Sequence, residues 1–269
     1  MARTAGIVLA GGRSSRMGAP KACLEWHGST LVRRVAGILG RTLDGPVVIV
    51  RARGQALPEL PDCEVVEDAR GERGPLEGLG AGLRAVGERA GVAFVAGVDT
   101  PLLHPAFVGA ILERLGPEDE ICVPVTDGVP HPLAAAYRTG VGAEVAELLG
   151  ADRLRLGLLL ERCRVRRVSG GDLPHPESLV NLNDPDDYAG ARERRAPEIR
   201  LLIRSGLARA EWSGGGARAS RAATLGQAAA AAGIRLGPGV AGTVNGRTAG
   251  VDPEVPLVEG DVVAFGPSR

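Results

Sequence analysis

The stretch that decides the fold is Leu9-Ala10-Gly11-Gly12-Arg13-Ser14-Ser15-Arg16-Met17-Gly18-Ala19-Pro20-Lys21. It follows Gly6-Ile7-Val8-Leu9, an apolar run too short for a helix, which predicts a buried strand. The paired glycines let the backbone turn sharply and expose successive N–H groups, and such an array of amides attracts an anion. Arg16 and Lys21 add positive charge to the same loop. We therefore expect a phosphate-binding loop at the carboxyl end of the first strand.

This loop differs from the two common phosphate-binding patterns. The P-loop requires Lys directly after its second Gly, whereas Lys21 stands three residues after Gly18, and the stretch contains no Gly-x-Gly-x-x-Gly. Its pattern, Leu-Ala-Gly-Gly-x-Ser-x-Arg-Met-Gly-x-x-Lys, resembles the signature of the MobA-like nucleotidyltransferases, which include the molybdenum cofactor guanylyltransferases. The alternative is an ordinary Gly-rich turn with solvated charges, but so many ordered positions argue against it.

Composition and charge restrict what the chain can do. Its 269 residues are enough for two domains, and 44% hydrophobic residues can fill a core, which must be aliphatic because aromatics are only 3%. Lys plus Arg and Asp plus Glu both number 32, so the chain lacks the net basic charge of a general nucleic-acid binder.

The spacing of the cysteines and the length of the apolar runs indicate in which cellular compartment the protein works. The four cysteines are far apart, which predicts reduced thiols rather than a disulfide framework or a zinc site. The first residues do not resemble a secretory signal, and no apolar run approaches the roughly 20 residues that span a bilayer. We expect a cytoplasmic protein with no nucleic-acid or membrane partner.

Beyond the loop, short apolar strands alternate with helical segments. Ser29 is the expected N-cap of a helix beginning near Leu31. Further strands are expected at 46–50, 64–66, 92–98, 121–125, 131–137 and 163–168, and helices from Pro75 and at 105–115, 141–149 and 154–161. This alternation predicts an α/β fold with a mainly parallel, Rossmann-like doubly wound sheet and helices on both faces.

A charged run, Arg192-Glu193-Arg194-Arg195, precedes Ala196-Pro197 and predicts a boundary between domains at 1–196 and 197–269. The second domain is expected to contain strands Ile199–Ile203, Ala208–Trp212, Val240–Asn245 and Val262–Phe265, with a helix 225–232 capped by Thr224.

This second part resembles the sulfur carriers of the MoaD/ThiS family through Val244-Asn245-Gly246-Arg247 and Gly260-Asp261-Val262-Val263-Ala264-Phe265. The resemblance implies a small α+β domain of the β-grasp (ubiquitin-like) type. The sequence closes on Gly266-Pro267-Ser268-Arg269 rather than on the diglycine of that family. We therefore expect either docking of other molybdenum cofactor assembly proteins or a stabilising appendage, rather than sulfur transfer.

Two carboxylates follow predicted strands. Asp68 comes after the strand at 64–66, and Asp99 comes after the longest apolar strand. Ligands of parallel sheets bind beyond the carboxyl ends of the strands, so both side chains are expected beside the Gly11-Gly12 loop. Asp99 is either a helix cap or a ligand for a hard cation. Next to a phosphate loop we favour Mg²⁺, because a nucleoside triphosphate brings that ion with it.

The MobA-like resemblance extends over about residues 5–190 and has four landmarks: the glycine loop, Gly74-Pro75-Leu76-x-Gly78, Asp99-x-Pro101 and Asn181-x-Asn183-x-Pro185. It implies that the nucleotide contacts Leu9, Ala10, Gly11, Gly12, Lys21, Asp68, Gly78 and Asp99, with Asp68 at the nucleoside end. It also implies that Asp99, Lys21 and Arg16 are catalytic, that Asp99 binds the metal, and that Asn181 and Asn183 contact the acceptor.

The implied reaction joins GMP from GTP to the phosphate of molybdopterin, with release of pyrophosphate. Family members often carry Asn at the end of the second strand, where this chain has Val50-Arg51, so recognition of the base is less well supported than phosphate binding. Alternatives are CTP or another phosphate-bearing acceptor, and a degenerate enzyme that acts as an interaction protein. His131 has either a structural or an acceptor-contacting role.

Overall fold

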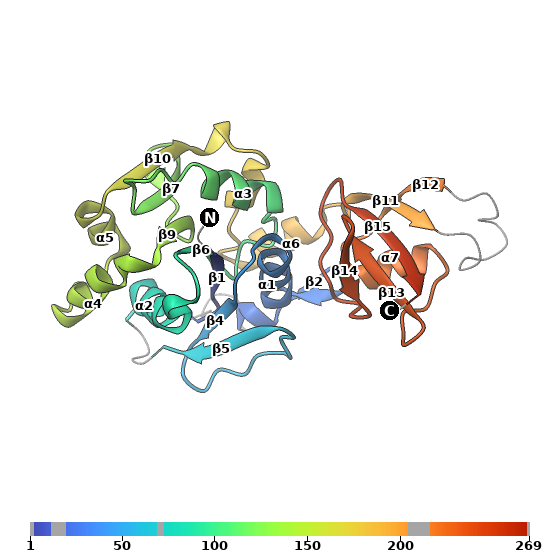
Figure 1. Ribbon diagram of the computed structural model, residues 1–269, viewed down its shortest axis with the longest axis horizontal. Helices are drawn as coiled ribbons and strands as arrows, with labels where there is room; N and C mark the ends of the chain where they lie inside the picture. Colours follow the sequence, from blue (N-terminus) through green and yellow to red (C-terminus); the bar gives the residue numbers. More distant parts are fainter. Residues whose placement is uncertain (1–2, 12–19, 69–72, 204–215, 268–269) are drawn as a thin grey trace. The chain divides into compact units, whose positions relative to one another are not determined.

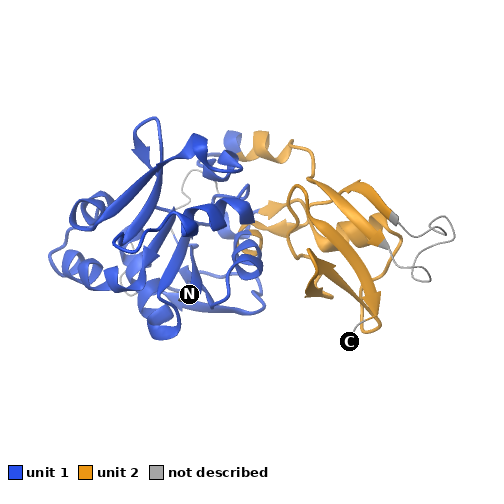
Figure 2. Ribbon diagram, turned by 45° about the horizontal axis from the view of Figure 1, so that its top comes forward, with its two compact units in different colours: residues 1–24, 35–187 blue, residues 25–34, 188–269 orange. Residues whose placement is uncertain are grey.

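The computed structural model describes residues 3–11, 20–68, 73–203 and 216–267. Its contacts divide the chain into two compact units, which Figure 2 shows in different colours. The first unit comprises residues 1–24 and 35–187, and the second comprises residues 25–34 and 188–269. Among the described residues, no helix has both the length and the apolar character needed to cross a bilayer.

The first unit is built on a mainly parallel sheet with the strand order β10-β7-β9-β6-β1-β4-β5, and β8 pairs with β7 (Figure 1). Strand β9 runs antiparallel to both β6 and β7, as expected for a strand returning along the sheet. The strands are β1 Thr4–Leu9, β4 Val47–Arg51, β5 Cys63–Glu67, β6 Val92–Gly97, β7 Ile121–Thr126, β8 Val129–Pro130, β9 Ala134–Arg138 and β10 Val165–Ser169.

Helices cover both faces of this sheet. A Cβ on Gly6 would lie 3.1 Å from Leu39 of α1, whereas a Cβ on Gly82 of α2 would lie only 2.5 Å from Ile7. Because neighbouring strand residues point to opposite faces, α1 and α2 lie on opposite sides of β1. Up to residue 192, the α-helices of the described residues are α1 Leu31–Thr42, α2 Pro75–Val86, α3 Pro105–Glu113, α4 Gly142–Gly150, α5 Leu156–Arg162 and α6 Pro185–Arg192.

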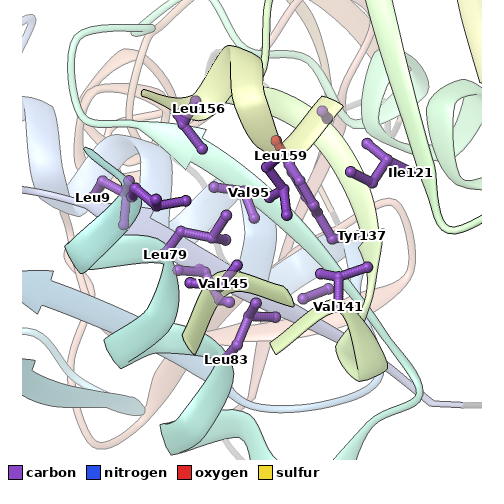
Figure 3. Packing of buried hydrophobic residues seen from close by; sticks show 14 of the residues in the cluster. Leu9, Leu79, Leu83, Val95, Ile121, Tyr137, Val141, Val145, Leu156 and Leu159 are labelled. Carbon is purple, nitrogen blue, oxygen red and sulfur yellow. The ribbon is translucent and has the colours of Figure 1, made fainter. Parts of the chain in front are cut away.

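One large aliphatic core lies between the sheet and α2, α4 and α5. Leu79 and Leu83 of α2, Val145 of α4 and Leu159 of α5 pack against Val95 of the sheet (Figure 3). This confirms both the aliphatic core and the predicted mixed α/β architecture with a mainly parallel sheet. The described residues of the first unit also form five short 3-10 helices: η1 Lys21–Cys23, η2 Gly87–Arg89, η3 Thr139–Val141, η4 Gly170–Asp172 and η5 Pro176–Leu179.

The predicted cap of α1 is wrong by one residue. Ser29 lies in the short strand β3 (Ser29–Thr30), which pairs with β2 (Glu25–Trp26). The hydroxyl of Thr30 instead accepts the N–H of Arg33, at 3.4 Å. Serine and threonine both favour the N-cap position. The hairpin of β2 and β3, whose strands have two residues each, is too short to leave a pattern in the sequence. It makes Thr30 rather than Ser29 the residue before α1.

The second unit contains a five-stranded sheet in the order β12-β11-β15-β13-β14, in which β11 and β15 are parallel. Helix α7 packs on it through Leu225, and the hydroxyl of Thr224 accepts the N–H of Gln227, as predicted. The predicted strand Ala208–Trp212 lies outside the described residues. The strand that pairs with β11 is β12, and neither β12 nor β14 was predicted. The elements are β11 Glu198–Ile203, β12 Gly216–Arg221, α7 Leu225–Ala231, β13 Val240–Val244, β14 Arg247–Gly250 and β15 Val262–Pro267.

Candidate functional site

The glycine loop leaves β1 next to the end of β4. The N–H groups of Ala10 and Gly11 both donate to the carbonyl of Val50, at 2.8 and 3.2 Å. A Cβ on Gly11 would lie 3.0 Å from the backbone nitrogen of Ala52, so this close approach requires glycine. Leu9 and Ala10 are buried and Gly11 is exposed. Gly12 and Arg16, both predicted site residues, lie outside the described residues.

Lys21 and Asp99 form an ion pair at the carboxyl edge of the sheet. Lys21 Nζ lies 3.1 Å from Asp99 Oδ2, and the two side chains are 18% and 26% exposed. Lys21 begins η1, and Asp99 lies two residues beyond the end of β6. Gly97 leaves room for the carboxylate, because a Cβ there would lie 2.6 Å from Asp99 Oδ1. The structure therefore brings together a cation and an anion that the sequence separates by 78 positions.

The Asn-Leu-Asn segment lies beside Asp99. The backbone N–H of Leu182 donates to the carbonyl of Asp99 at 2.9 Å, and the side chain of Leu182 is buried. Asn181 and Asn183 on either side of it are exposed. The N–H of Asn183 donates to Asp187 in the first turn of α6, at 2.9 Å. Both asparagines thus flank a residue that is hydrogen-bonded to Asp99.

Asp68 lies at the end of β5, and its backbone N–H donates to the carbonyl of Arg51 at 3.0 Å. Its Oδ1 is buried and has no hydrogen-bond partner within the described part of the chain. Burial raises the pKa of this carboxyl, and the nearby Glu77 adds to the effect. An unpaired buried acceptor is costly unless a ligand supplies a donor. Asp68 therefore suits a ligand that carries N–H or O–H groups.

Gly78 has a packing role in the structure. It is buried in α2, and a Cβ there would lie 3.3 Å from Leu9 Cδ2. The glycine therefore lets α2 approach the end of β1 closely. Its predicted contact with the nucleotide stays a prediction.

Three residues near this edge were missed by the sequence reasoning or left without a role. Arg51 donates to Glu67 Oε1 at 3.0 Å, and Gln55 donates from Nε2 to the carbonyl of Ala10 at 3.0 Å. His131 Nε2 is buried without a partner among the described residues, and burial lowers the pKa of this imidazole. An isolated Gln in a polar loop leaves no pattern in a single sequence, so nothing pointed to Gln55.

Comparisons with known proteins agree with this geometry. A family model described as the MobA-like NTP transferase domain matches residues 6–165. A probable molybdenum cofactor guanylyltransferase of Bacillus cereus strain B4264 is 33% identical over 198 residues, covering 72% of this chain and 98% of that protein. A protein of the same name from Bacillus anthracis strain CDC 684 / NRRL 3495 has the same identity and coverage.

Solved structures share the fold. Molybdopterin-guanine dinucleotide biosynthesis protein A of Archaeoglobus fulgidus has a TM-score of 0.58 at 23% identity, over 70% of this chain and 97% of that chain. Rv0371c of Mycobacterium tuberculosis H37Rv has a TM-score of 0.57 at 26% identity, over 71% of this chain and 98% of that chain. The family model alone matches more than half of the sequence. This chain belongs to the MobA-like NTP transferase family.

Proposed function

We propose that the chain is a molybdenum cofactor guanylyltransferase, which transfers GMP from GTP to the phosphate of molybdopterin and releases pyrophosphate. The names of its Bacillus relatives support the substrates. The observation that carries the proposal is the ion pair of Lys21 and Asp99 between the glycine loop and the Asn-Leu-Asn segment. Lys21, which we assign to the phosphates, and Asp99, which we assign to the metal, lie together at one edge of the sheet.

In this proposal the nucleotide occupies the glycine loop. Gly11 and Gly12 leave room for the phosphates, Leu9 and Ala10 form the buried end of the strand, and Lys21 and Arg16 neutralise the charge of the phosphates. The nucleoside end lies toward Asp68 and Gly78. Oδ1 of Asp68, which has no hydrogen-bond partner among the described residues, supports this placement, because it can accept a hydrogen bond from a ribose hydroxyl or a base N–H.

The acceptor lies on the side of Asn181 and Asn183, whose exposed amides can donate to a phosphate. An acceptor phosphate is already anionic, so its oxygen attacks the α-phosphorus without a general base. Catalysis then depends on positioning and on neutralising charge, and Lys21 can supply both. The reaction therefore needs neither a protein nucleophile nor a general base to activate one.

The residues present fit a divalent cation that arrives with the triphosphate. Within the described ranges, no three His, Cys, Asp or Glu side chains form a group that could hold a metal ion. Mg²⁺ bound to a nucleotide commonly takes only one or two protein carboxylates, its other ligands being phosphates and water. Asp99, which is partly exposed, meets that need, and we propose it as the ligand for Mg²⁺. The bound ion would neutralise charge on the triphosphate.

One solved structure with this fold contains a divalent ion. Rv0371C of Mycobacterium tuberculosis has been solved in complex with manganese, and it has a TM-score of 0.53 at 23% identity to this chain. At that identity the likeness shows the fold alone. We propose that the divalent ion of this chain is Mg²⁺ and that Asp99 binds it.

For the second unit we propose a β-grasp (ubiquitin-like) domain. We place the domain boundary between residues 196 and 197, so that the two domains comprise residues 1–196 and 197–269. The support is its topology: numbered within the unit from β11, the strand order is 2-1-5-3-4, the first and last strands are parallel, and one helix follows the first hairpin. We further propose that this domain docks other molybdenum cofactor assembly proteins.

A cytidylyltransferase is the second candidate function, and the Val50-Arg51 pair at the end of β4 keeps it open. Val50-Arg51 stands where members of the family often carry the Asn that touches the nucleotide, and the guanidinium of Arg51 donates to Glu67. Base selection by this chain can therefore differ from that of its relatives. A third candidate, a degenerate enzyme acting only through interactions, is disfavoured by the intact pair of Lys21 and Asp99.

The deciding experiment is calorimetric titration of the purified chain with GTP, CTP and ATP, each with Mg²⁺, followed by pyrophosphate release in the presence of molybdopterin. We expect tighter binding of GTP and acceptor-dependent release of pyrophosphate. Preference for CTP would establish the second candidate. Absence of binding to all three nucleotides would overturn the nucleotidyltransferase proposal.

A further inference from the structure

The loop that follows β4 contacts the start of the nucleotide loop through one side chain. Gln55 Oε1 accepts the N–H of Ala52 at 3.0 Å, and Gln55 Nε2 donates to the carbonyl of Ala10 at 3.0 Å. Because Ala52 offers a donor and Ala10 offers an acceptor, the amide can only lie with Oε1 toward Ala52 and Nε2 toward Ala10. The side chain of Gln55 is half-buried. A single amide therefore joins the β4–β5 loop to the residue just after β1.

With this contact, every main-chain polar group of Ala10 is paired. Its N–H and that of Gly11 donate to Val50, and its carbonyl accepts from Gln55. The backbone at the exit of β1 is thus held by the end of β4 on one side and by Gln55 on the other. Such pairing fixes the orientation of the peptide from which the glycine loop begins.

The other end of the nucleotide loop contacts the same segment. Cys23, two residues after Lys21, donates from its thiol to the carbonyl of Ala56, the residue after Gln55, at 3.6 Å. A thiol is a weak donor, so this contact is weaker than the amide bonds. Residues 52–56 therefore contact Ala10, just before the stretch 11–21, and Cys23, just after it.

Arg51 stabilises the segment 52–56 itself. It donates to the carbonyl of Gln55 at 2.9 Å and to Glu67 Oε1 at 3.0 Å. Glu67 Oε1 also accepts the N–H of Gly54 at 3.1 Å, and this bond and the positive charge of Arg51 lower the pKa of Glu67. Arg51 thus stabilises the loop that carries Gln55.

We propose that Gln55 is a positioning residue, which sets the affinity for a nucleoside triphosphate by fixing the Ala10–Gly11 backbone. The inference rests on the proposed function, because it takes the stretch 11–21 to be the phosphate-binding loop. Gln55 acts through the main chain of Ala10, so its loss should weaken binding of the nucleotide and leave the reacting groups in place.

The test uses Gln55→Glu, which keeps the acceptor for Ala52 and replaces the donor to Ala10 with a carboxylate oxygen. At about pH 8 we expect the Kd for GTP with Mg²⁺ to rise about tenfold relative to the unmodified chain, as for the loss of one buried hydrogen bond. At about pH 4, below the ordinary pKa of Glu at about 4.3, the introduced carboxyl is mostly protonated and can donate again, so the ratio of the two Kd values should fall toward one.

Asn245→Asp in the second unit is the matched control. Its amide also bridges two partners, accepting from Val262 and donating to Asp261, both at 2.8 Å. We expect this variant to lose thermal stability with an unchanged Kd. If Gln55→Glu does not fold, Gln55→Met, which removes both hydrogen bonds, replaces it in the same comparison and should also weaken binding.

The outcomes separate the two proposals. If the unmodified chain binds none of GTP, CTP and ATP, the proposed function fails and the role of Gln55 fails with it. If the unmodified chain binds and the folded Gln55 variant has the same Kd, only the role of Gln55 is overturned. A Kd ratio that stays raised and does not change with pH would also overturn it, because a merely structural loss would not be reversed by protonation.

Discussion

Lys21 Nζ lies 3.1 Å from Asp99 Oδ2, and both side chains retain some exposure to solvent. The pair joins the end of the glycine loop to the end of β6. Each partner is also the group that we assign to a substrate: Lys21 to the phosphates and Asp99 to Mg²⁺. Binding of the nucleotide would therefore exchange this ion pair for new contacts on both sides.

Asp99→Ala and Lys21→Ala should each fold normally and lose activity. Removing one charge-stabilising group from a preorganised site costs about 10²–10³ in rate. Asp99→Ala should also flatten the dependence of the rate on Mg²⁺, because it removes the proposed ligand. Pyrophosphate release, measured over a Mg²⁺ series, checks both points. Near-native turnover of Asp99→Ala with an unchanged Mg²⁺ requirement would show that the site is placed wrongly.

The double variant Lys21→Ala with Asp99→Ala tests whether the two groups act together. Residues that act as a unit show effects that do not add, so we expect the double variant to lose little more than the worse of the two single variants. A loss equal to the product of the single losses would mean that Lys21 and Asp99 act independently.

Asp68→Asn should raise the stability of the fold and weaken the binding of GTP. At neutral pH the substitution removes a charge that burial and Glu77 disfavour, so the melting temperature of the chain should rise. The same variant should bind GTP more weakly, because the amide accepts hydrogen bonds less strongly than the carboxylate does. Thermal melting and titration calorimetry on one preparation check both directions.

The pH dependence of that effect has a definite sign. The pKa of Asp68 is raised in the folded state, so the folded chain binds the proton more readily than the unfolded chain does. The contribution of Asp68 to stability is therefore favourable below its ordinary pKa and is lost as the pH rises through the raised value. The gain from Asp68→Asn should accordingly shrink as the solution is acidified, and a gain that grows at low pH would contradict this assignment.

Much of the site could be predicted because it lies at the ends of apolar runs. Asp68 comes shortly after the apolar pair Val65-Val66 and Asp99 comes after the apolar run 92–98, and parallel strands put such residues at one edge of the sheet. Gln55, by contrast, acts through a single contact across 45 positions, which no local pattern records. Strand β14 was missed because its four residues, Arg247–Gly250, show no apolar alternation.

Asn181→Ala and Asn183→Ala should affect the acceptor rather than the nucleotide. Both side chains are exposed, so each substitution should change the free energy of unfolding by no more than about 0.5 kcal/mol. Loss of one hydrogen bond to a charged phosphate should raise the KM for molybdopterin roughly tenfold. The Kd for GTP, measured without acceptor, should stay the same. A weakened Kd for GTP with an unchanged KM for molybdopterin would move both residues to the nucleotide side.

The last prediction compares two helical glycines. A Cβ on Gly82 of α2 would lie 2.5 Å from Ile7 Cγ2, whereas a Cβ on Gly109 of α3 would have nothing within 4 Å. Replacing Gly with Ala in a helix gains about 1 kcal/mol, but overpacking a core costs roughly 1–3 kcal/mol. Gly109→Ala should therefore raise the melting temperature measured by circular dichroism, and Gly82→Ala should lower it. If both variants were stabilised, the spacing between α2 and β1 would have to be wider than the structure shows.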